Sequence, residues 1–289
     1  MFTRSQIVMD TLATIRVVRP GAEEAVERAF GWFYEIEGRC TRFNPQSELM
    51  RLTSQIGVSV PVSPILFESV QFALRVAEET QGAFDPTIGH SMETRGFNRE
   101  YGTGEIVRTA ITPDEQVSYR DVRLDPDAQT IQLERPLILD LGAVAKGLAI
   151  DLAARELQPF TDFSIDAGGD LYLGGSNEEG APWCVGIRHP RAVDCVMYEL
   201  RASNQAVCTS GDYERAHHIL DPRASELAAS VAAVTVVASN AMLADALSTA
   251  AFVLGPGDGI ALLERMGVDG LIVTPELEVH KTQGLRRAA

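Results

Sequence analysis

The hydrophobic positions in the first part of the chain predict one strand followed by two amphipathic helices. Residues 11–18 (TLATIRVV) alternate and are rich in β-branched side chains, which is typical of a strand that Pro20-Gly21 would end. From 22 to about 40, apolar residues recur at helical spacing opposite acidic ones, which predicts a helix with one buried face. A second helix is expected from Ser63, a candidate N-cap, to Thr80, with Gly82 as its stop.

The remainder of the chain is dominated by runs of short strands. Glycines and scattered charges between 88 and 120 indicate loops. Strands are predicted at 121–124, 130–133, 136–140, 162–166, 170–174, 183–188, 195–202, 206–208, 231–238 and 269–273, and helices at 143–157, 240–253 and 258–266, with Gly255-Pro256-Gly257 between the last two. Because strands and helices do not alternate strictly, the pattern predicts an α+β fold, a largely antiparallel sheet core with packed helices.

Composition and charge narrow the class of protein. A chain of 289 residues with 45% hydrophobic and 22% charged residues fits one globular domain over 1–289, either as one body or as two lobes with the site between them. A net charge of -15 without any basic cluster disfavours nucleic acid as a partner. No apolar run has the length of a signal peptide or approaches the roughly 20 residues of a membrane span, so a cytoplasmic protein without membrane insertion is expected.

The cysteines carry no sign of metal or redox chemistry. Cys40, Cys184, Cys195 and Cys208 have no C-x-x-C spacing, and their neighbours are mostly apolar. Reduced, buried thiols are therefore expected at all of these positions.

The segment LDLGAVAKGLAID, residues 139–151, is the strongest candidate for binding an anion. A predicted strand ends at Asp140, turns through Gly142 and enters a helix that carries Lys146. The start of a helix presents free backbone N–H groups and a positive dipole end. The pattern is not a Walker A loop, because Lys146 precedes Gly147 and no Ser or Thr follows it. The alternative interpretation is an ordinary strand–helix turn with a surface lysine.

Asp245 and Thr249 form a candidate magnesium site on a predicted helix. The two residues stand four apart in NAMLADALST, so both side chains emerge from one face of the helix. A carboxylate and a hydroxyl are hard oxygen ligands, and Mg²⁺ takes few ligands from the protein and the rest from phosphate and water. The alternative is a pair that is hydrogen-bonded within the core.

Polar residues crowd between two apolar strands at 209–222 (TSGDYERAHHILDP), a pattern typical of acid/base chemistry. His217 and His218 are adjacent, so in a strand only one of them can face a given ligand. Asp221 precedes Pro222, which places an acid at a turn. Purely structural histidines are the alternative. Two loops carry Phe43 and Phe84, whose rings either stack on a flat ligand or pin the loops to the core.

Taken in order, nine segments resemble the FAD:protein FMN transferase (ApbE) family. The order and the span of these segments, which run over most of the chain, carry the resemblance. The segments are MDT (9–11), RFNPQSEL (42–49), GAFDPT (82–87), DLGAVAKG (140–147), DAGGD (166–170), WCVGIRHP (183–190), TSGDYER (209–215), HHILDP (217–222) and ADALSTA (244–250).

The resemblance implies an ApbE-type, T-fold-like architecture with a site for FAD and Mg²⁺. Positions that match flavin-nucleotide contacts of the family are Met9, Phe43, Ala83, Phe84, Asp85, Asp140, Lys146 and Ile219. The family's metal site matches the backbone oxygen of Ala143 with Asp245 and Thr249. The implied reaction joins FMN from FAD to a Thr or Ser hydroxyl of an acceptor protein and releases AMP. His218 or Asp221 is the candidate to take the proton or to orient the acceptor, and the sequence does not choose between them.

Three departures from the family pattern keep other functions open. Asp10 and Ala224-Ser225 stand where the family usually has Gly and Thr-Gly, and the single Ala216 replaces a longer hairpin before the two histidines. The second and third lie on the expected acceptor side of the site. An FAD pyrophosphatase, in which water replaces the acceptor, is therefore one alternative. A flavin-binding module without turnover is the other, although intact Asp140, Lys146, Asp245 and Thr249 favour an enzyme.

Overall fold

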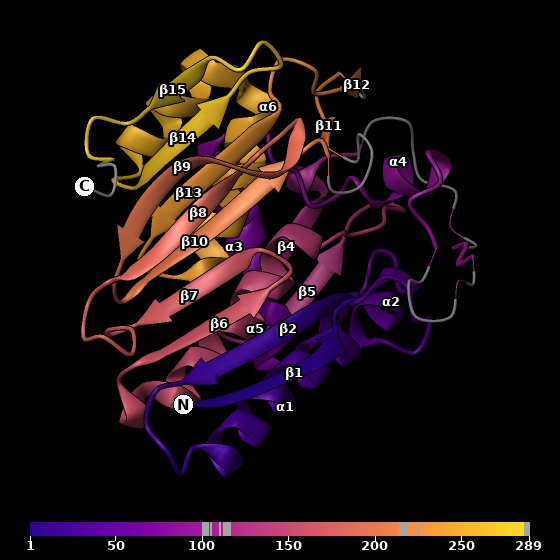
Figure 1. Cartoon of the computed structure of the whole chain (residues 1–289). Coiled ribbons are helices and arrows are strands. Elements are labelled where there is room, and N and C mark those ends of the chain that lie inside the picture. Colours follow the sequence, from indigo (N-terminus) through magenta and orange to yellow (C-terminus); the bar gives the residue numbers. More distant parts are fainter. Residues whose placement is uncertain are drawn as a thin grey trace.

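An eight-stranded antiparallel sheet forms the centre of the molecule (Figure 1). The computed structural model describes residues 1–99, 104, 106–109, 111, 117–213, 219–224 and 226–285, without the side chain of residue 193. In spatial order the strands are β1 (Phe2–Val8), β2 (Thr11–Val17), β6 (Phe163–Ala167), β7 (Asp170–Gly174), β10 (Gln205–Gly211), β13 (Ala233–Ala238), β14 (Asp269–Val273) and β15 (Val279–Lys281). The predicted α+β class with an antiparallel sheet is therefore confirmed.

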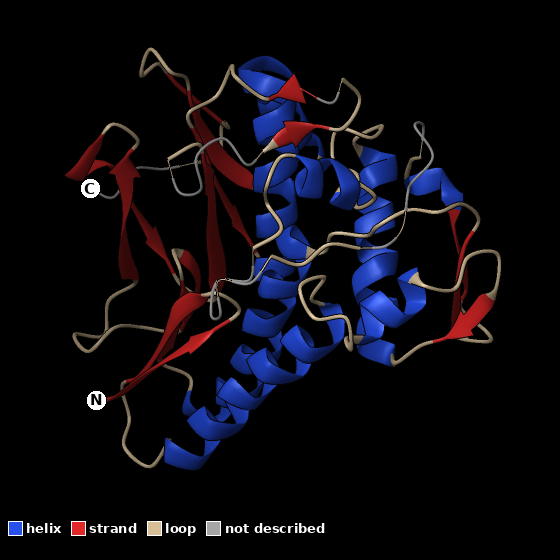
Figure 2. Ribbon diagram, turned by 90° about the vertical axis from the view of Figure 1, so that its right-hand side faces the viewer, coloured by secondary structure: helices blue, strands red, loops and turns tan. Residues whose placement is uncertain are grey.

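Helices cover one face of this sheet, as the edge-on view in Figure 2 shows. The long ones are α1 (Glu23–Cys40), α3 (Pro64–Glu79), α5 (Gly142–Leu157) and α6 (Ala241–Arg265), and the short ones are α2 (Glu48–Thr53), α4 (Gly89–Thr94), η1 (Tyr119–Asp121) and η2 (Gln158–Phe160). The fully buried rings of Phe30, Phe33 and Phe252 lie between helices and sheet. A small sheet of β3 (Ser59–Pro61), β5 (Thr130–Leu133) and β4 (Val122–Asp125) lies beyond the helices.

A hairpin of β8 (Trp183–His189) and β9 (Ala192–Ala202) packs on the opposite face of the main sheet and closes a second apolar cluster. Val185 and Ile187 point into this cluster, whereas the alternate residue Cys184 is exposed. Cys195 is also exposed, so the expectation of four buried thiols is wrong at these two positions. At Cys184 the buried neighbour Val185 points to the other face of the strand, which is why the apolar sequence misled the prediction, whereas the neighbour Val196 of Cys195 is itself exposed.

Most predicted elements are confirmed, and the errors have local causes. Ser63 caps α3, since its Oγ accepts a hydrogen bond from the backbone N–H of Leu66 at 3.3 Å. The predicted strand at 136–140 is wrong, because Ile138 makes only an isolated bridge to Ile88. Strand β1 was not predicted, because four of its seven residues are exposed and it lies at the sheet edge. A hairpin of β11 (Leu220–Asp221) and β12 (Glu226–Leu227) completes the fold.

Helix α6 is more apolar than expected, and it contains the break that the sequence predicts. At Gly255 the backbone is not helical (φ 81°, ψ 177°) ahead of Pro256, so two helical segments meet there at a kink. With 25 residues and a mean hydropathy of 1.4, it passes by length and composition as a membrane-spanning helix, contrary to the expectation that no segment would. Because 61% of its apolar stretch is buried inside the fold, the same properties suit a helix in the core of a globular protein.

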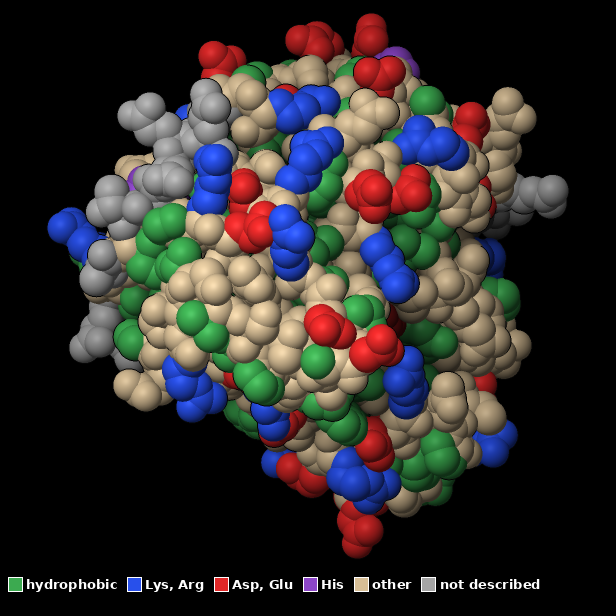
Figure 3. Space-filling model, turned by 180° about the vertical axis from the view of Figure 1, so that it is seen from behind, with side chains coloured by type: hydrophobic (Ala, Val, Ile, Leu, Met, Phe, Trp, Pro, Cys, Tyr) green, Lys and Arg blue, Asp and Glu red, His purple; other side chains and the backbone are tan. Residues whose placement is uncertain are grey.

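Charged side chains of both signs are interspersed on the face shown in Figure 3. Blue Lys and Arg side chains lie beside red Asp and Glu side chains there, and they do not merge into one basic track.

Candidate functional site

Lys146 and Asp245 meet where helices α5 and α6 cross. The Nζ of Lys146 lies 3.2 Å from Oδ2 of Asp245, and it also contacts the carboxylate of Asp170 at the start of β7. The side chains of both acids are largely buried, with exposed fractions of 6% for Asp170 and 9% for Asp245, while that of Lys146 is 24% exposed. Three segments that are distant in sequence therefore bring two carboxylates and one ammonium together.

Hydroxyl groups extend this cluster along α6 and β10. The Oγ of Ser210 lies 3.3 Å from Oγ1 of Thr249 and 2.7 Å from Oγ of Ser248. Thr249 is half-buried on the same face of α6 as Asp245, one turn further on. The other oxygen of Asp170 accepts the backbone N–H of Thr209 at 3.0 Å, which ties β7 to β10 at this point. The prediction that Asp245 and Thr249 lie one turn apart on the same helix is confirmed.

Ala143 lies on α5 one turn before Lys146 and is half-buried. Residues three apart share a face of a helix, and helical carbonyl groups point along the axis toward the next turn. The carbonyl of Ala143 therefore points toward the turn that carries Lys146. Its predicted role as a metal ligand stays a prediction.

The α5–α6 interface is held by two residues of α5 that follow Lys146. A Cβ on Gly147 would lie 2.5 Å from Cα of Met242, so only glycine lets the helices approach this closely. The carboxylate of Asp151 accepts the backbone N–H groups of Ala241 and Met242 at 2.7 and 3.0 Å. Both contacts fix the start of α6, one turn before Asp245.

A second group of residues surrounds the turn that leads into α5. The buried Arg42 donates from Nε to Oδ2 of Asp140 at 2.6 Å, and its guanidinium lies 4.3 Å from the ring centroid of Phe43. The other oxygen of Asp140 accepts the N–H of Gly142 at 2.8 Å, and the N–H of Asp140 donates to the carbonyl of Pro86 at 2.7 Å. The segments 42–49, 82–87 and 140–147 therefore meet, as the predicted flavin contacts require.

This second group lies close to the Lys146 cluster. From Gly142 to Lys146, α5 advances by about 6 Å at 1.5 Å per residue. Beside Phe43, a hollow of about 320 Å³ opens, lined by Asp10, Tyr34, Glu37, Gly38, Thr41, Phe43 and Asn44. Phe43 is half-buried and borders this hollow, and its predicted contact with the flavin stays a prediction.

The loop of Ala83, Phe84 and Asp85 is packed inside the protein. Phe84 is 5% exposed and belongs to the main core, which supports the interpretation of its ring as a pin for the loop. Asp85 accepts hydrogen bonds from Thr87 and from the backbone N–H of Tyr119, and burial raises the pKa of its carboxyl. These bonds shape the loop, and the predicted nucleotide contacts of its three residues stay predictions.

Met9 lies in the tight turn between β1 and β2. Met9 and Asp10 have positive φ angles of 49° and 60°, the pattern of a two-residue type I′ turn. Glycine is favoured in that conformation, which explains why it is the usual residue where Asp10 stands, and Asp10 adopts the same conformation at a cost in backbone strain. Met9 is half-buried against the core.

The region 214–218 lies outside the described residues, so the structure does not place His217 or His218. Ile219, which follows, is buried in the main core. Asp221, the alternative to His218 as proton acceptor, is paired with Arg223 at 2.7 Å, and hydrogen bonds from that side chain lower the pKa of its carboxyl. A lowered pKa makes Asp221 a weaker base and suits it better to orienting a partner.

Sequence reasoning missed three residues that the structure brings to these groups. Asp170 stands in DAGGD, where only the glycines drew attention, and Arg42 precedes the aromatic of RFNP. Asp151 looked like an ordinary polar position of the helix. For Asp151 and Asp170 a signal was present, because a charged residue among apolar neighbours needs a partner when buried, whereas Arg42 stands in a polar segment that gives no such signal.

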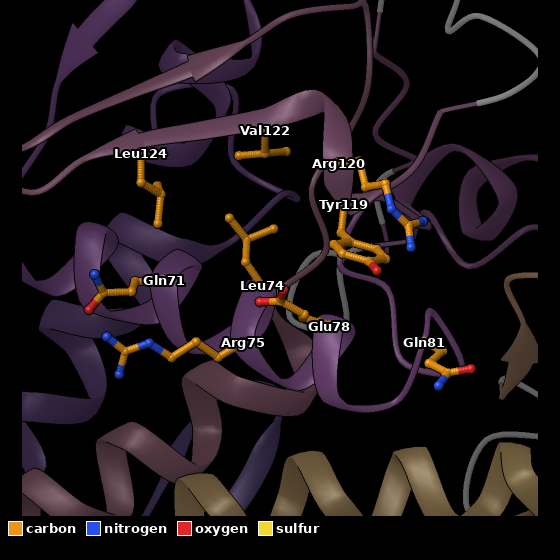
Figure 4. Close-up of a pocket in the computed structure, with 9 residues that line it drawn as sticks. All are labelled: Gln71, Leu74, Arg75, Glu78, Gln81, Tyr119, Arg120, Val122 and Leu124. Carbon is orange, nitrogen blue, oxygen red and sulfur yellow. The ribbon is translucent and has the colours of Figure 1, made fainter.

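A separate groove of about 530 Å³ lies between α3 and β4 (Figure 4). Leu74 points from α3 toward Val122 of β4, and the guanidinium of Arg120 lies 4.5 Å from the ring centroid of Tyr119. The hydrogen bond from the backbone N–H of Tyr119 to Asp85, 3.0 Å long, connects this groove to the loop at 82–87. No pattern in the sequence predicts this groove.

Comparison with known proteins places the chain in a family. Residues 9–272 match the ApbE family. The protein named FAD:protein FMN transferase from Treponema pallidum is 31% identical, covering 98% of this chain and 87% of that protein. Its Escherichia coli K12 namesake is 30% identical over 83% of this chain and 74% of its own length. The crystal structure of the ApbE protein from Thermotoga maritima superimposes with a TM-score of 0.86 at 27% identity, covering 98% and 97% of the two chains.

The chain belongs to the ApbE family. The resemblance drawn from the ordered segments is thereby confirmed, and the match to the Thermotoga structure confirms the expected architecture.

Proposed function

We propose that this chain transfers FMN from FAD to a Thr or Ser hydroxyl of an acceptor protein, with Mg²⁺ bound at Asp245 and Thr249. By family and by relatives about 30% identical over most of its length, it is an FAD:protein FMN transferase. Our proposal goes beyond the family assignment in three respects: the identity of the metal, the type of acceptor hydroxyl and the roles of individual residues. The observation that carries them is the contact of Lys146 with Asp170 and Asp245, with Thr249 one turn further along α6 beside Ser210.

The chemistry of these donors fits a magnesium ion. Carboxylate, hydroxyl and carbonyl oxygens are ligands that Mg²⁺ prefers, and Asp245, Thr249 and the backbone oxygen of Ala143 are the proposed donors. Asp170 shares the Lys146 ammonium with Asp245. Within the residues that the structure describes, no three His, Cys, Asp or Glu side chains gather as a metal-binding group. Few protein ligands suit a metal that shares its coordination with phosphate and water.

The proposed reaction exchanges one phosphorus–oxygen bond for another. The acceptor hydroxyl attacks the FMN phosphorus, the bond from that phosphorus to the bridging oxygen breaks, and AMP leaves with that oxygen. A bound Mg²⁺ would neutralise charge that develops on the diphosphate. Lys146 supplies a positive charge next to the start of α5, where the diphosphate would lie. His218 is the proposed acceptor of the hydroxyl proton, and Asp221 orients the acceptor segment.

The test is transfer of FMN to an acceptor peptide that contains a Thr or Ser flavinylation segment. Wild type incubated with FAD and Mg²⁺ should yield AMP and a flavin-labelled peptide, detected by mass spectrometry. Asp245→Ala should lose at least about 100-fold of this activity, as expected when a group that stabilises transition-state charge is removed. Asp127→Ala, which changes an exposed carboxylate, is the control. Undiminished transfer by Asp245→Ala would refute the metal role.

Leaving out the acceptor distinguishes the alternatives. Release of free FMN and AMP at the same rate with and without peptide would identify an FAD pyrophosphatase. Binding of FAD without any product would identify a flavin-binding module.

A further inference from the structure

Lys146 contacts the carboxylate that is proposed to hold the metal. Its ammonium lies 3.2 Å from Oδ2 of Asp245 and also touches Asp170. The three groups carry a combined charge of -1. A divalent cation on Asp245 would therefore lie within a few ångströms of an ammonium ion.

Two positive groups cannot share this carboxylate without repulsion. The side chains of Asp170 and Asp245 are largely buried, so water screens the repulsion poorly. A divalent cation binds Asp245 at full strength only if the Lys146 ammonium moves away. The diphosphate of FAD would supply the ammonium with another partner beside the start of α5.

We propose that Lys146 is a counter-ion that withholds Asp245 from divalent cations until the diphosphate of FAD draws its ammonium away. This inference rests on the proposed function, because it concerns the same metal and the same nucleotide. It assigns Lys146 a positioning role in ordering the two ligands, in addition to contacting the nucleotide.

The ammonium of Lys146 can move, whereas its backbone is held in place. Lys146 carries its charge on a flexible four-carbon stem and is 24% exposed, so the head can move. Its backbone lies on α5 next to Gly147, which packs against the backbone of α6 at Ala241 and Met242. The ammonium can therefore change partners while Asp245 stays in place.

The two ligands should then bind cooperatively. Coupling between two sites is reciprocal, so the factor by which FAD raises the cation affinity equals the factor by which the cation raises the FAD affinity. Part of this coupling is direct, since a diphosphate binds divalent cations itself. Removing the ammonium should abolish the part that Lys146 contributes.

The experiment measures Mn²⁺ binding to the full-length protein by electron paramagnetic resonance, without FAD. The sequence contains two lysines, Lys146 and Lys281, so Lys281→Met is a matched control that removes the same charge from an exposed position on β15. Lys146→Met should bind Mn²⁺ at least about tenfold more tightly than wild type and Lys281→Met, within the usual range of coupling between sites. Thermal melting verifies folding, and Lys146→Gln replaces Lys146→Met if the latter does not fold.

A second measurement follows FAD binding by flavin fluorescence with and without Mn²⁺. The increase in FAD affinity caused by Mn²⁺ should be smaller in Lys146→Met than in wild type and Lys281→Met. If both Lys146 variants bind Mn²⁺ no more tightly than wild type, the counter-ion role is refuted. FMN transfer by wild type is assayed separately, so failure of that activity would refute the proposed function while leaving the cation result to be judged by itself.

Discussion

The carboxylate of Asp151 on α5 accepts the backbone N–H of Ala241, the first residue of α6, at 2.7 Å. Its second oxygen accepts the N–H of Met242 at 3.0 Å. The first N–H groups of a helix have no partner within the helix, so Asp151 from the neighbouring helix caps two of them, while the local N-cap Asn240 accepts the N–H of Leu243 at 2.9 Å. Asp151 thereby sets where α6 begins and, one turn later, where Asp245 lies.

Replacing this carboxylate should loosen the start of α6. We expect Asp151→Ala to lower the free energy of unfolding by about 1–2 kcal/mol, the usual cost of losing a helix cap. FMN transfer should fall as well, because Asp245 and Thr249 lose their fixed position. Urea denaturation and the transfer assay measure the two effects, with Asp127→Ala as the exposed control. Equal stability of both variants would contradict the capping role.

The same residue should make stability depend on pH. Burial raises the pKa of Asp151 to about 6 from 3.8, so the folded chain holds this proton more tightly than the unfolded chain. Stability from the protonated carboxyl is therefore fully present below about pH 4 and is lost as the pH rises through about 6.

Asp151→Asn does not titrate and isolates this effect. The unfolding free energy of wild type minus that of Asp151→Asn should fall by about 2 kcal/mol between pH 4 and pH 7, since each pKa unit corresponds to 1.36 kcal/mol and part of the effect is already lost at pH 4. Urea denaturation at several pH values measures the difference. A difference that is constant or rises with pH would exclude a raised pKa.

Gly147 should be intolerant of any side chain. A Cβ would lie 2.5 Å from Cα of Met242 and 2.6 Å from the carbonyl oxygen of Ala241, so the two helix backbones would have to separate. We expect Gly147→Ala to destabilise the fold by about 1–3 kcal/mol, the range for overpacking in a core. Gly31→Ala is the control, because a Cβ on that helical glycine of α1 meets nothing within 4 Å.

Thermal melting of both variants tests this prediction. Gly31→Ala should be neutral or more stable by up to about 1 kcal/mol, since alanine favours helix over glycine. If both substitutions have the same effect, close contact between α5 and α6 at Gly147 is not what selects glycine there.

Arg42 should be required for binding FAD as well as for stability. It bonds Asp140 and also the carbonyl of Phe97, and it is 5% exposed. Arg42→Met leaves the carboxylate of Asp140 without this partner and should cost about 3 kcal/mol, as for a broken buried ion pair. Because the turn at Asp140 leads into α5, FAD affinity should also fall. Flavin fluorescence measures it, and exposed Arg75→Met is the control with unchanged affinity.

The sequence predicts what depends on neighbours along the chain. Ser63 and Pro64 mark the start of α3, and a spacing of four residues is enough to place Asp245 and Thr249 on a common face of α6. Periodicity and caps are local signals, so these elements follow directly from the order of residues.

Contacts between residues that are distant in sequence cannot be predicted from these local signals. The residues around Asp170 in the sequence do not indicate its contact with Lys146. That contact depends on where β7 lies in the sheet relative to α5, which only the folded structure shows. The same holds for Arg42 with Asp140, which lie 98 positions apart. The apolar residues of 136–140 predict a strand, yet they are buried without joining a sheet ladder. Burial alone therefore does not distinguish a strand from a packed extended segment.

Because two of the four thiols are exposed and two are buried, thiol labelling can measure the fraction of molecules that are folded. Burial raises the pKa of Cys40 to about 11 and also raises that of Cys208, so both stay protonated and unreactive, whereas Cys184 and Cys195 face solvent. A maleimide dye should therefore attach at two positions in the native chain and at four after denaturation. Mass spectrometry of the labelled protein would then report the native fraction of each variant described above.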